Sequence, residues 1–278
     1  MTNPVILTSL HGDLCGLTKE GHIAGVGLQG IHTGRVDGVN GTDYFLRPSP
    51  LIVEIFDDFN GYALDNVWGA LKGSDGSCNV ALQAEVDGAV RLTSGAGSTH
   101  TVAVNGAQIV GGKTWQAQGA TGAGVTNRFA FEANVGKASA LTSQTIFIGM
   151  GDAVTLNAPF TLSGTTLTAN ATNGVGFLYD AAGTGSYTNL TLVAVNAGGT
   201  PQKVAISNAI STTAFHKYRV ELDGSGNANF YIDGALVGSI ASAVAVTALL
   251  TPTVEMFSEA TSASATLDVD YIYARQER

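Results

Sequence analysis

Hydrophobic and polar residues alternate most regularly in the last third of the chain. Every second residue is apolar from His216 to Leu222, and the same period recurs from Ala228 to Ile232 and from Leu267 to Tyr273. A period of two places successive side chains on opposite faces of a strand. Asp233-Gly234 is typical of a hairpin turn, because glycine adopts positive φ without steric cost. These runs therefore predict half-buried antiparallel strands.

Shorter runs of the same kind begin near residue 52 and are separated by clusters of Gly, Asn, Asp and Ser. They predict strands at Ile52 to Phe59, Ala89 to Thr93, Arg128 to Val135, Thr145 to Met150, Val175 to Tyr179, Leu190 to Val195, Lys203 to Ser207 and Leu236 to Ile240. The stretch from Ala241 to Leu250 fits either a strand or a short helix. Many short strands joined by turns predict an all-β protein, a two-sheet antiparallel sandwich of the jelly-roll type.

The first 52 residues show no such pattern. Glycine recurs every few residues from His11 to Gly41 without a period of 2 or 3.6, and Pro48-Ser49-Pro50 ends the segment in extended conformation. We therefore expect residues 1–52 to form an extended glycine-rich arm that needs a partner to order it, and residues 53–278 to form the sandwich. A disordered tail is the open alternative for the first segment.

Composition and charge exclude several classes of function. Glycine accounts for 36 of 278 residues, and only 13% are charged, against about 25% in typical globular proteins. The net charge is −9 and the Lys and Arg residues are scattered, so we expect no binding to nucleic acid or to a membrane surface. The N-terminus lacks a basic and apolar leader pattern, so no secretory signal is expected. Cys15 and Cys78 do not make a disulfide framework, and buried thiols are expected.

Three segments in order resemble the concanavalin A-like lectin/glucanase superfamily, whose members include laminin-G-like jelly rolls. They are Phe56 to Gly61, the hairpin from Phe215 to Gly238 that contains Asp223-Gly224 and Asp233-Gly234, and the closing strand Thr266 to Tyr273. The resemblance covers about residues 53–278, and residues 95–200 carry no matching motif. It implies two curved antiparallel sheets with a concave face.

In hydrolases of that superfamily, the resemblance implies a carboxylate set Glu-x-Asp-x-Glu or Glu-x-Asp-x-x-Glu on the concave face. Alternate residues of one strand then place two carboxyl groups beside the same glycosidic bond. Glu85-Val86-Asp87 and Glu221-Leu222-Asp223 begin such a set, but neither continues to a second glutamate. We therefore expect no catalytic residues and no enzymatic activity.

Two other groups of residues are candidates for binding. Asp57, Asp58, Asp268 and Asp270 would approach one another if the first and last strands pair, and related domains often hold a structural calcium ion at the position of Asp270. Solvated carboxylates that discourage edge pairing are the alternative, and we prefer it. Trp115 follows a glycine-rich stretch and is the better candidate for stacking on a sugar, whereas Trp68 is expected to pack inward. No other cofactor is expected.

These observations lead to three hypotheses about function. The first is a non-enzymatic virion protein, a bacteriophage head decoration or cement protein on the capsid exterior, whose N-terminal arm binds neighbouring capsid subunits. Such a protein is expected to be a symmetric homo-oligomer, a trimer or dimer. The alternatives are a lectin-like carbohydrate-binding module of a tail fibre or adhesin, and a divergent polysaccharide-degrading enzyme.

Overall fold

The computed structural model divides the chain into two units, Met1–Val53 with Arg278 and Glu54–Glu277. It describes residues 35–37, 43–45, 52–60, 64, 67–83, 88–97, 101–111, 115–117, 129–152, 155–156, 158–163, 166–181, 187–259 and 264–277. In the first unit, β1 (Arg35–Asp37) pairs antiparallel with β2 (Asp43–Phe45). The sequence pattern predicted no strand there, because three-residue runs are too short to show a period. Nearly all of the rest of the predicted arm lies outside the described residues.

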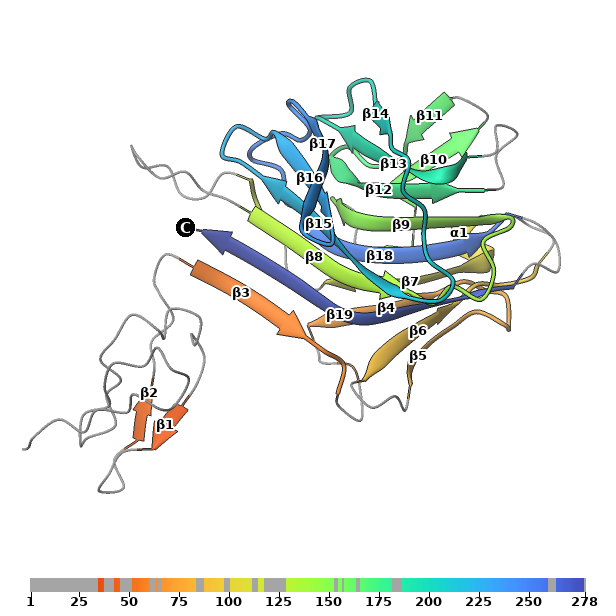
Figure 1. Ribbon diagram of the computed structural model, residues 1–278, viewed down its shortest axis with the longest axis horizontal. Helices are drawn as coiled ribbons and strands as arrows, with labels where there is room; N and C mark the ends of the chain where they lie inside the picture. Colours follow the sequence, from red (N-terminus) through yellow and green to blue (C-terminus); the bar gives the residue numbers. More distant parts are fainter. Residues whose placement is uncertain are drawn as a thin grey trace, which may run out of the picture. The chain divides into compact units, whose positions relative to one another are not determined.

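Two antiparallel sheets make up most of the second unit (Figure 1). Within the described residues, the first sheet has seven strands. Their spatial order is β14 (Gln202–Ala205), β13 (Tyr187–Val195), β12 (Gly174–Asp180), β9 (Gln144–Gly151), β18 (Thr251–Ser258), β7 (Gly106–Gly111) and β4 (Trp68–Lys72). The neighbours in this order are distant in sequence, so the sheet depends on long-range pairing.

The second sheet contains the strongly alternating segments. Its order in the described part of the chain is β17 (Ala235–Ile240), β16 (Ala228–Ile232), β15 (Phe215–Leu222), β8 (Phe129–Gly136), β19 (Thr266–Glu277), β6 (Ala89–Thr93) and β5 (Asn79–Gln83). An eighth strand, β3 (Ile52–Asp57), also pairs with β19. The first and last predicted strands are therefore neighbours, as expected.

Aromatic side chains fill the space between the two sheets. Phe177 of β12 packs edge-on against Tyr218 of β15 and Phe230 of β16, with ring centroids 5.4 Å apart in both pairs. All three rings are buried, and burial raises the pKa of the Tyr218 hydroxyl far above its usual value. The prediction of an all-β, two-sheet jelly-roll sandwich is confirmed. No helix in the described residues is long and apolar enough to cross a membrane.

The predicted strands are present, and most of the boundaries shift by one to three residues. The strands that the pattern did not predict are β4, β5, β7, β18 and the pair β10 (Phe160–Ser163) and β11 (Thr166–Ala169). The stretch from Ala241 to Leu250, left open between strand and helix, forms turns, and only Leu250 makes a bridge, with Trp115.

The unpredicted pair β10–β11 and the short helix α1 (Val102–Asn105) pack on one face of the seven-stranded sheet. This face is opposite to the one that carries Phe177, and we call it the outer face. Phe160 of β10 packs against Phe147 of β9 at 5.8 Å, and Val102 of α1 packs against Phe257 of β18. In Figure 1, β10 and β11 lie beside β12 and β13. Part of the outer face is therefore covered by elements of the chain itself.

Candidate functional site

Glu255 is the central polar residue of the outer face. It lies on β18, opposite Phe147 of β9 and Gln108 of β7 in the strand register. Thr253 and Glu255 point to the outer face, while Val254 and Met256 fill the space between the sheets. Local alternation therefore places a carboxyl group on a covered face.

Burial changes the chemistry of this carboxyl group. Glu255 is only 1% exposed, and within the described residues neither of its oxygens has a hydrogen-bond partner. Desolvation disfavours the charged form and raises the pKa of Glu255 to about 8. The group is therefore protonated at neutral pH and is able to donate a proton.

Other polar groups lie beside Glu255 on the same face. Gln108 and Thr251 are buried, and the side-chain oxygens Oε1 of Gln108 and Oγ1 of Thr251 have no partner among the described residues. Thr253, between Thr251 and Glu255 on β18, donates from Oγ1 to the Thr251 carbonyl at 3.2 Å. Buried polar groups normally have partners, so a line of unsatisfied groups indicates a position for a ligand or water.

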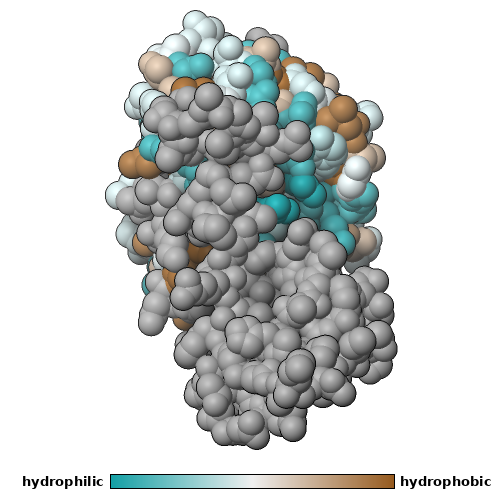
Figure 2. All heavy atoms as spheres, turned by 90° about the vertical axis from the view of Figure 1, so that its left-hand side faces the viewer, coloured by the Kyte–Doolittle hydropathy of each residue, from teal (hydrophilic) through white to brown (hydrophobic). Residues whose placement is uncertain are grey.

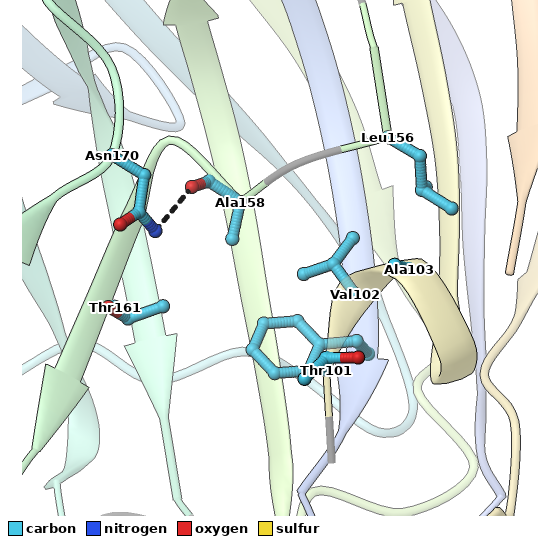
Figure 3. Close-up of a pocket in the computed structure, with 8 residues that line it drawn as sticks. Thr101, Val102, Ala103, Leu156, Ala158, Thr161 and Asn170 are labelled. Atoms are coloured by element: carbon cyan, nitrogen blue, oxygen red, sulfur yellow. Dashed lines mark hydrogen bonds between the residues drawn. The ribbon is translucent and has the colours of Figure 1, made fainter. Parts of the chain in front are cut away.

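A pocket of about 410 Å³ opens on the outer face, next to this line. Its lining residues are Thr101, Val102, Ala103, Leu156, Ala158, Thr161, Asn170 and Phe257. Figure 3 shows Asn170 and Thr161 on one side of the pocket and Val102, Ala103 and Leu156 on the other. Phe257 lies two residues from Glu255 along the same face of β18, about 7 Å away along the strand, and Glu255 itself is not part of the pocket lining. Mixed apolar and hydroxyl lining at this volume is typical of a small-molecule site.

Two more carboxyl groups lie near the end of β9 on this face. Asp180 of β12 is opposite Thr145 of β9 in register, and Thr145 donates from Oγ1 to Oε1 of Glu259 at 2.5 Å. Asp180 is buried, and its charge helps to raise the pKa of the neighbouring Tyr179. Glu255 on β18, Glu259 just after the end of β18, and Asp180 on β12 are therefore the acidic residues placed toward this face.

The sequence pattern does not predict this group, because the expected set of three acids lies on one strand. The positions of β9 that point to the outer face are Thr145, Phe147, Gly149 and Gly151, so this strand contributes no acid there. Glu221 lies on β15 of the other sheet and pairs with Arg219, and Asp223 follows in the turn. Glu85 and Asp87 are outside the described residues.

The tryptophan residues and the described cysteine that the sequence analysis considered are buried. Trp115 is 3% exposed, stacks on Phe129 at 5.3 Å, and bonds to Leu250 through its backbone. Its ring is therefore part of the core and offers no face to a sugar. Trp68 is also buried and packs edge-on against Phe59, as expected. Cys78 is a buried free thiol, and Cys15 lies outside the described residues.

The four aspartates proposed for calcium are satisfied by protein groups. Asp270 accepts a hydrogen bond from Nδ2 of Asn134 at 2.7 Å, and Asp268 pairs with Arg91 at 2.7 and 2.8 Å. Asp57 accepts the backbone N–H of Phe59, and Asp58 accepts those of the Asn60 side chain and backbone. Among the described residues, no group of three or more His, Cys, Asp or Glu is arranged to hold a metal ion. Asp270 as a calcium ligand stays a prediction.

Solved structures share this fold at low sequence identity. An endo-1,3-β-glucanase from Streptomyces sioyaensis superposes with a TM-score of 0.53 and 13% identity, covering 82% of this chain and 98% of that one. A glycoside hydrolase family 16 endo-glucanase from Bacteroides ovatus gives 0.52 and 12%, covering 79% and 99%. The Emp47p carbohydrate recognition domain gives 0.51 and 12%, covering 82% and 97%. The fold is thus the concanavalin A-like jelly roll.

Comparison at the level of sequence gives no relatives. No family model matches the chain, and no curated protein matches it. The likeness to glucanases and to a carbohydrate recognition domain is therefore a likeness of fold, and function has to be argued from the outer face itself.

Two expectations about function are corrected. The solved structures named above are glucanases and a carbohydrate recognition domain, and the hypothesis of a non-enzymatic capsid decoration protein is wrong on this comparison. The exclusion of an enzyme is also wrong, because it rested only on a missing motif within one strand. Glu255 and Asp180 lie on separate strands of the outer face, and a motif within one strand cannot include both. The predicted homo-oligomer stays a prediction.

Proposed function

We propose that this protein acts on a polysaccharide, which binds on the outer face of the seven-stranded sheet beside Glu255. The observation that carries the proposal is a carboxylic acid that stays protonated at neutral pH, next to a pocket, in a fold that glucanases also use. Cleavage of a glycosidic bond needs an acid that protonates the leaving oxygen. Glu255 is the residue on this face with that property.

The pocket lining fits a sugar in two ways. Phe257 gives an aromatic ring next to Val102 and Ala158, and a sugar presents apolar C–H groups to such a surface. Thr101, Thr161 and Asn170 add polar groups at the rim that suit ring hydroxyls. Gln108, beside Glu255, has an amide oxygen without a partner among the described residues, and it would accept a hydrogen bond from a sugar hydroxyl.

A second carboxylate would complete the reaction. Asp180 lies two strands away from Glu255, and Glu259 comes just after the end of β18. Backbone spacing puts the Cα atoms of Glu255 and Asp180 about 12 Å apart. Retaining enzymes need carboxyl groups about 5 Å apart, and inverting enzymes leave room for a water between them. Depending on the distance between the carboxyl groups themselves, the second carboxylate would attack the sugar directly or activate water.

The test is release of reducing ends from a soluble β-1,3-glucan and a mixed-linkage β-glucan. Glu255→Gln keeps the shape of the protonated acid but cannot donate its proton, and we expect a loss of 10²-fold or more. Glu221→Gln, on the far face of the other sheet, is the matched control and should keep full activity. Equal activity of the two variants would overturn the role of Glu255.

Glycan binding without cleavage is the second candidate, and the composition of β9 favours it. The outer-face positions of β9 hold Thr145, Phe147 and two glycines, with no acid beside the pocket on that strand. Binding of the same glucans, without release of reducing ends by the intact protein, would support this second function.

A further inference from the structure

We infer that the site accepts the end of a glycan chain and excludes a chain that continues on both sides. This inference rests on the proposed function, and it concerns the hairpin β10–β11. A chain that lies across a sheet passes over all of its strands, so an element fixed over several strands would stop it. The hairpin occupies that position over β9, β12 and β13.

The sheet beneath the hairpin is shaped to hold an aromatic ring. A Cβ atom at Gly176 would lie 2.7 Å from the ring of Phe147, and one at Gly149 would lie 2.9 Å from it. Glycine at both positions therefore lets the ring lie directly on the sheet. Phe160 packs on Phe147, and Leu178 belongs to the same buried cluster. The outer face beneath Phe160 is therefore filled by the protein, and the remaining space beside β11 is a smaller pocket of about 240 Å³.

Hydrogen bonds fix the base of the hairpin to the sheet. Oδ2 of Asp152 accepts the backbone N–H of Asn173 at 2.7 Å, and Oδ1 accepts that of Thr172 at 3.2 Å. Oδ1 of Asn173 in turn accepts the backbone N–H groups of Ala197 at 2.9 Å and Ala245 at 3.1 Å. Two further loops are thus tied to the same point, and the hairpin is anchored as part of the fold.

The pocket lies at the edge of the hairpin β10–β11. Thr161 of β10 and Asn170 at the end of the hairpin form one wall, and Nδ2 of Asn170 donates to the Ala158 carbonyl at 2.9 Å (Figure 3). Val102 of α1 is on the opposite side. A sugar in the pocket therefore meets the hairpin wall, and the chain continues only away from it. The terminal residue of a glycan fits this arrangement, and an internal residue does not.

The experiment counts binding sites on two polymers, each cut to several mean lengths. Glu255→Gln protein, which should not shorten the probe, is titrated with a soluble β-1,3-glucan and a mixed-linkage β-glucan, each at several mean lengths. We expect the number of sites per gram to rise in proportion to the number of chain ends, so that tenfold more ends give about tenfold more sites. A constant number of sites per gram would overturn the inference and leave the proposed function intact. No binding at any length would overturn the proposed function and this inference with it.

A variant that lacks the hairpin provides the second measurement. Residues 162–169 are replaced by a short Gly-Ser linker, which keeps Ala158, Thr161 and Asn170 of the pocket, and melting is used to select folded protein. We expect more sites per gram on the longest polymer, at least several-fold, with little dependence on chain ends. Unchanged dependence on chain ends in the folded variant would overturn the role of the hairpin. The titration of the protein that keeps its hairpin decides the inference even where the shortened variant does not fold.

Discussion

Polar side chains on the outward-pointing faces of the two sheets differ in whether they have hydrogen-bond partners. On the eight-stranded sheet the polar side chains have partners, as in the partly exposed Arg91 with the buried Asp268 and in Tyr271 with Glu132. On the seven-stranded sheet they are buried, and Glu255, Gln108 and Thr251 have oxygens without partners in the described residues. Stability alone explains the first arrangement but not the second, because an unsatisfied buried group costs free energy. The second face is therefore the better candidate for function.

The exposed apolar residues support the same distinction. The large hydrophobic side chains that are exposed in the described part of the chain are Phe56, Val204, Leu236 and Leu249, which lie on different elements. Figure 2 shows one side of the molecule, where hydrophilic and hydrophobic residues are interspersed on the coloured surface. Isolated apolar residues of this kind are normal on a protein surface. They do not define a large docking face.

The largest expected difference between the two faces is in pH dependence. The folded state holds the proton of Glu255 up to about pH 8, whereas the unfolded chain releases it near 4.5. Stability therefore falls as pH rises through this window, by about 1.4 kcal/mol per unit and about 5 kcal/mol in total. Glu255→Gln removes this slope and should gain stability relative to the unaltered protein as pH increases. Denaturant unfolding at pH 5, 6, 7 and 8 measures it.

The control for that experiment is Glu221→Gln on the other sheet. Glu221 is partly exposed and paired with Arg219, so its replacement should leave the pH dependence close to that of the unaltered protein. Parallel pH curves for the Glu255 and Glu221 variants would contradict the buried, protonated state of Glu255.

A matched pair of aromatic substitutions tests which face is packed. Phe147→Ala removes a buried ring beneath the hairpin, and we expect a loss of about 3–5 kcal/mol. Phe56→Ala on β3 removes a ring that is 61% exposed and touches only Tyr271 among the described aromatic rings, so the loss should be under about 1 kcal/mol. Similar losses for both variants, measured by denaturant unfolding, would remove the distinction.

The two ion pairs on the eight-stranded sheet should contribute differently to stability, because the carboxylate of one is buried and that of the other is partly exposed. Arg91→Ala leaves the buried carboxylate of Asp268, only 1% exposed, without its cation, and we expect a loss of about 2–3 kcal/mol. Arg219→Ala breaks a pair in which both side chains are partly exposed, and the loss should be below about 1 kcal/mol. Unfolding in denaturant compares the two, and an equal loss would show that Asp268 is solvated.

Removal of one hydroxyl should cost less stability than Phe147→Ala or Arg91→Ala. Tyr271 donates from its hydroxyl to Oε1 of Glu132 at 2.6 Å at the partly exposed face, and this bond helps to raise the pKa of Tyr271. Tyr271→Phe keeps the ring contact with Phe56 and loses only the hydrogen bond, so we expect about 1 kcal/mol. A loss above that of Arg91→Ala would contradict a single, partly exposed hydrogen bond between Tyr271 and Glu132.

The same difference between faces explains what the sequence could predict. β15, β16 and β19 have one face in the core and one in solvent, so apolar and polar residues alternate and the strands were predicted. β7 and β18 are buried on both faces, so this signal is weak, and Pro252 argues against a central strand. The hairpin β10–β11 covers a sheet made by distant segments, which no local pattern specifies.

Glu255 was missed for a related reason. Its role depends on which strands lie beside β18 and on what covers them, and both are products of long-range pairing. The available signal was a single glutamate within Thr253-Val254-Glu255-Met256, an alternating run otherwise free of charge. Trp115 shows the reverse error, because a glycine-rich context predicted an exposed loop while its ring stacks on Phe129 in the core.

The most direct test of the account is a crystal structure of Glu255→Gln protein with a bound β-1,3-gluco-oligosaccharide. We predict sugar in the pocket between Val102 and Asn170, with a glycosidic oxygen within hydrogen-bond distance of residue 255. Sugar bound instead over Phe56 and Tyr271 on the eight-stranded sheet would contradict it.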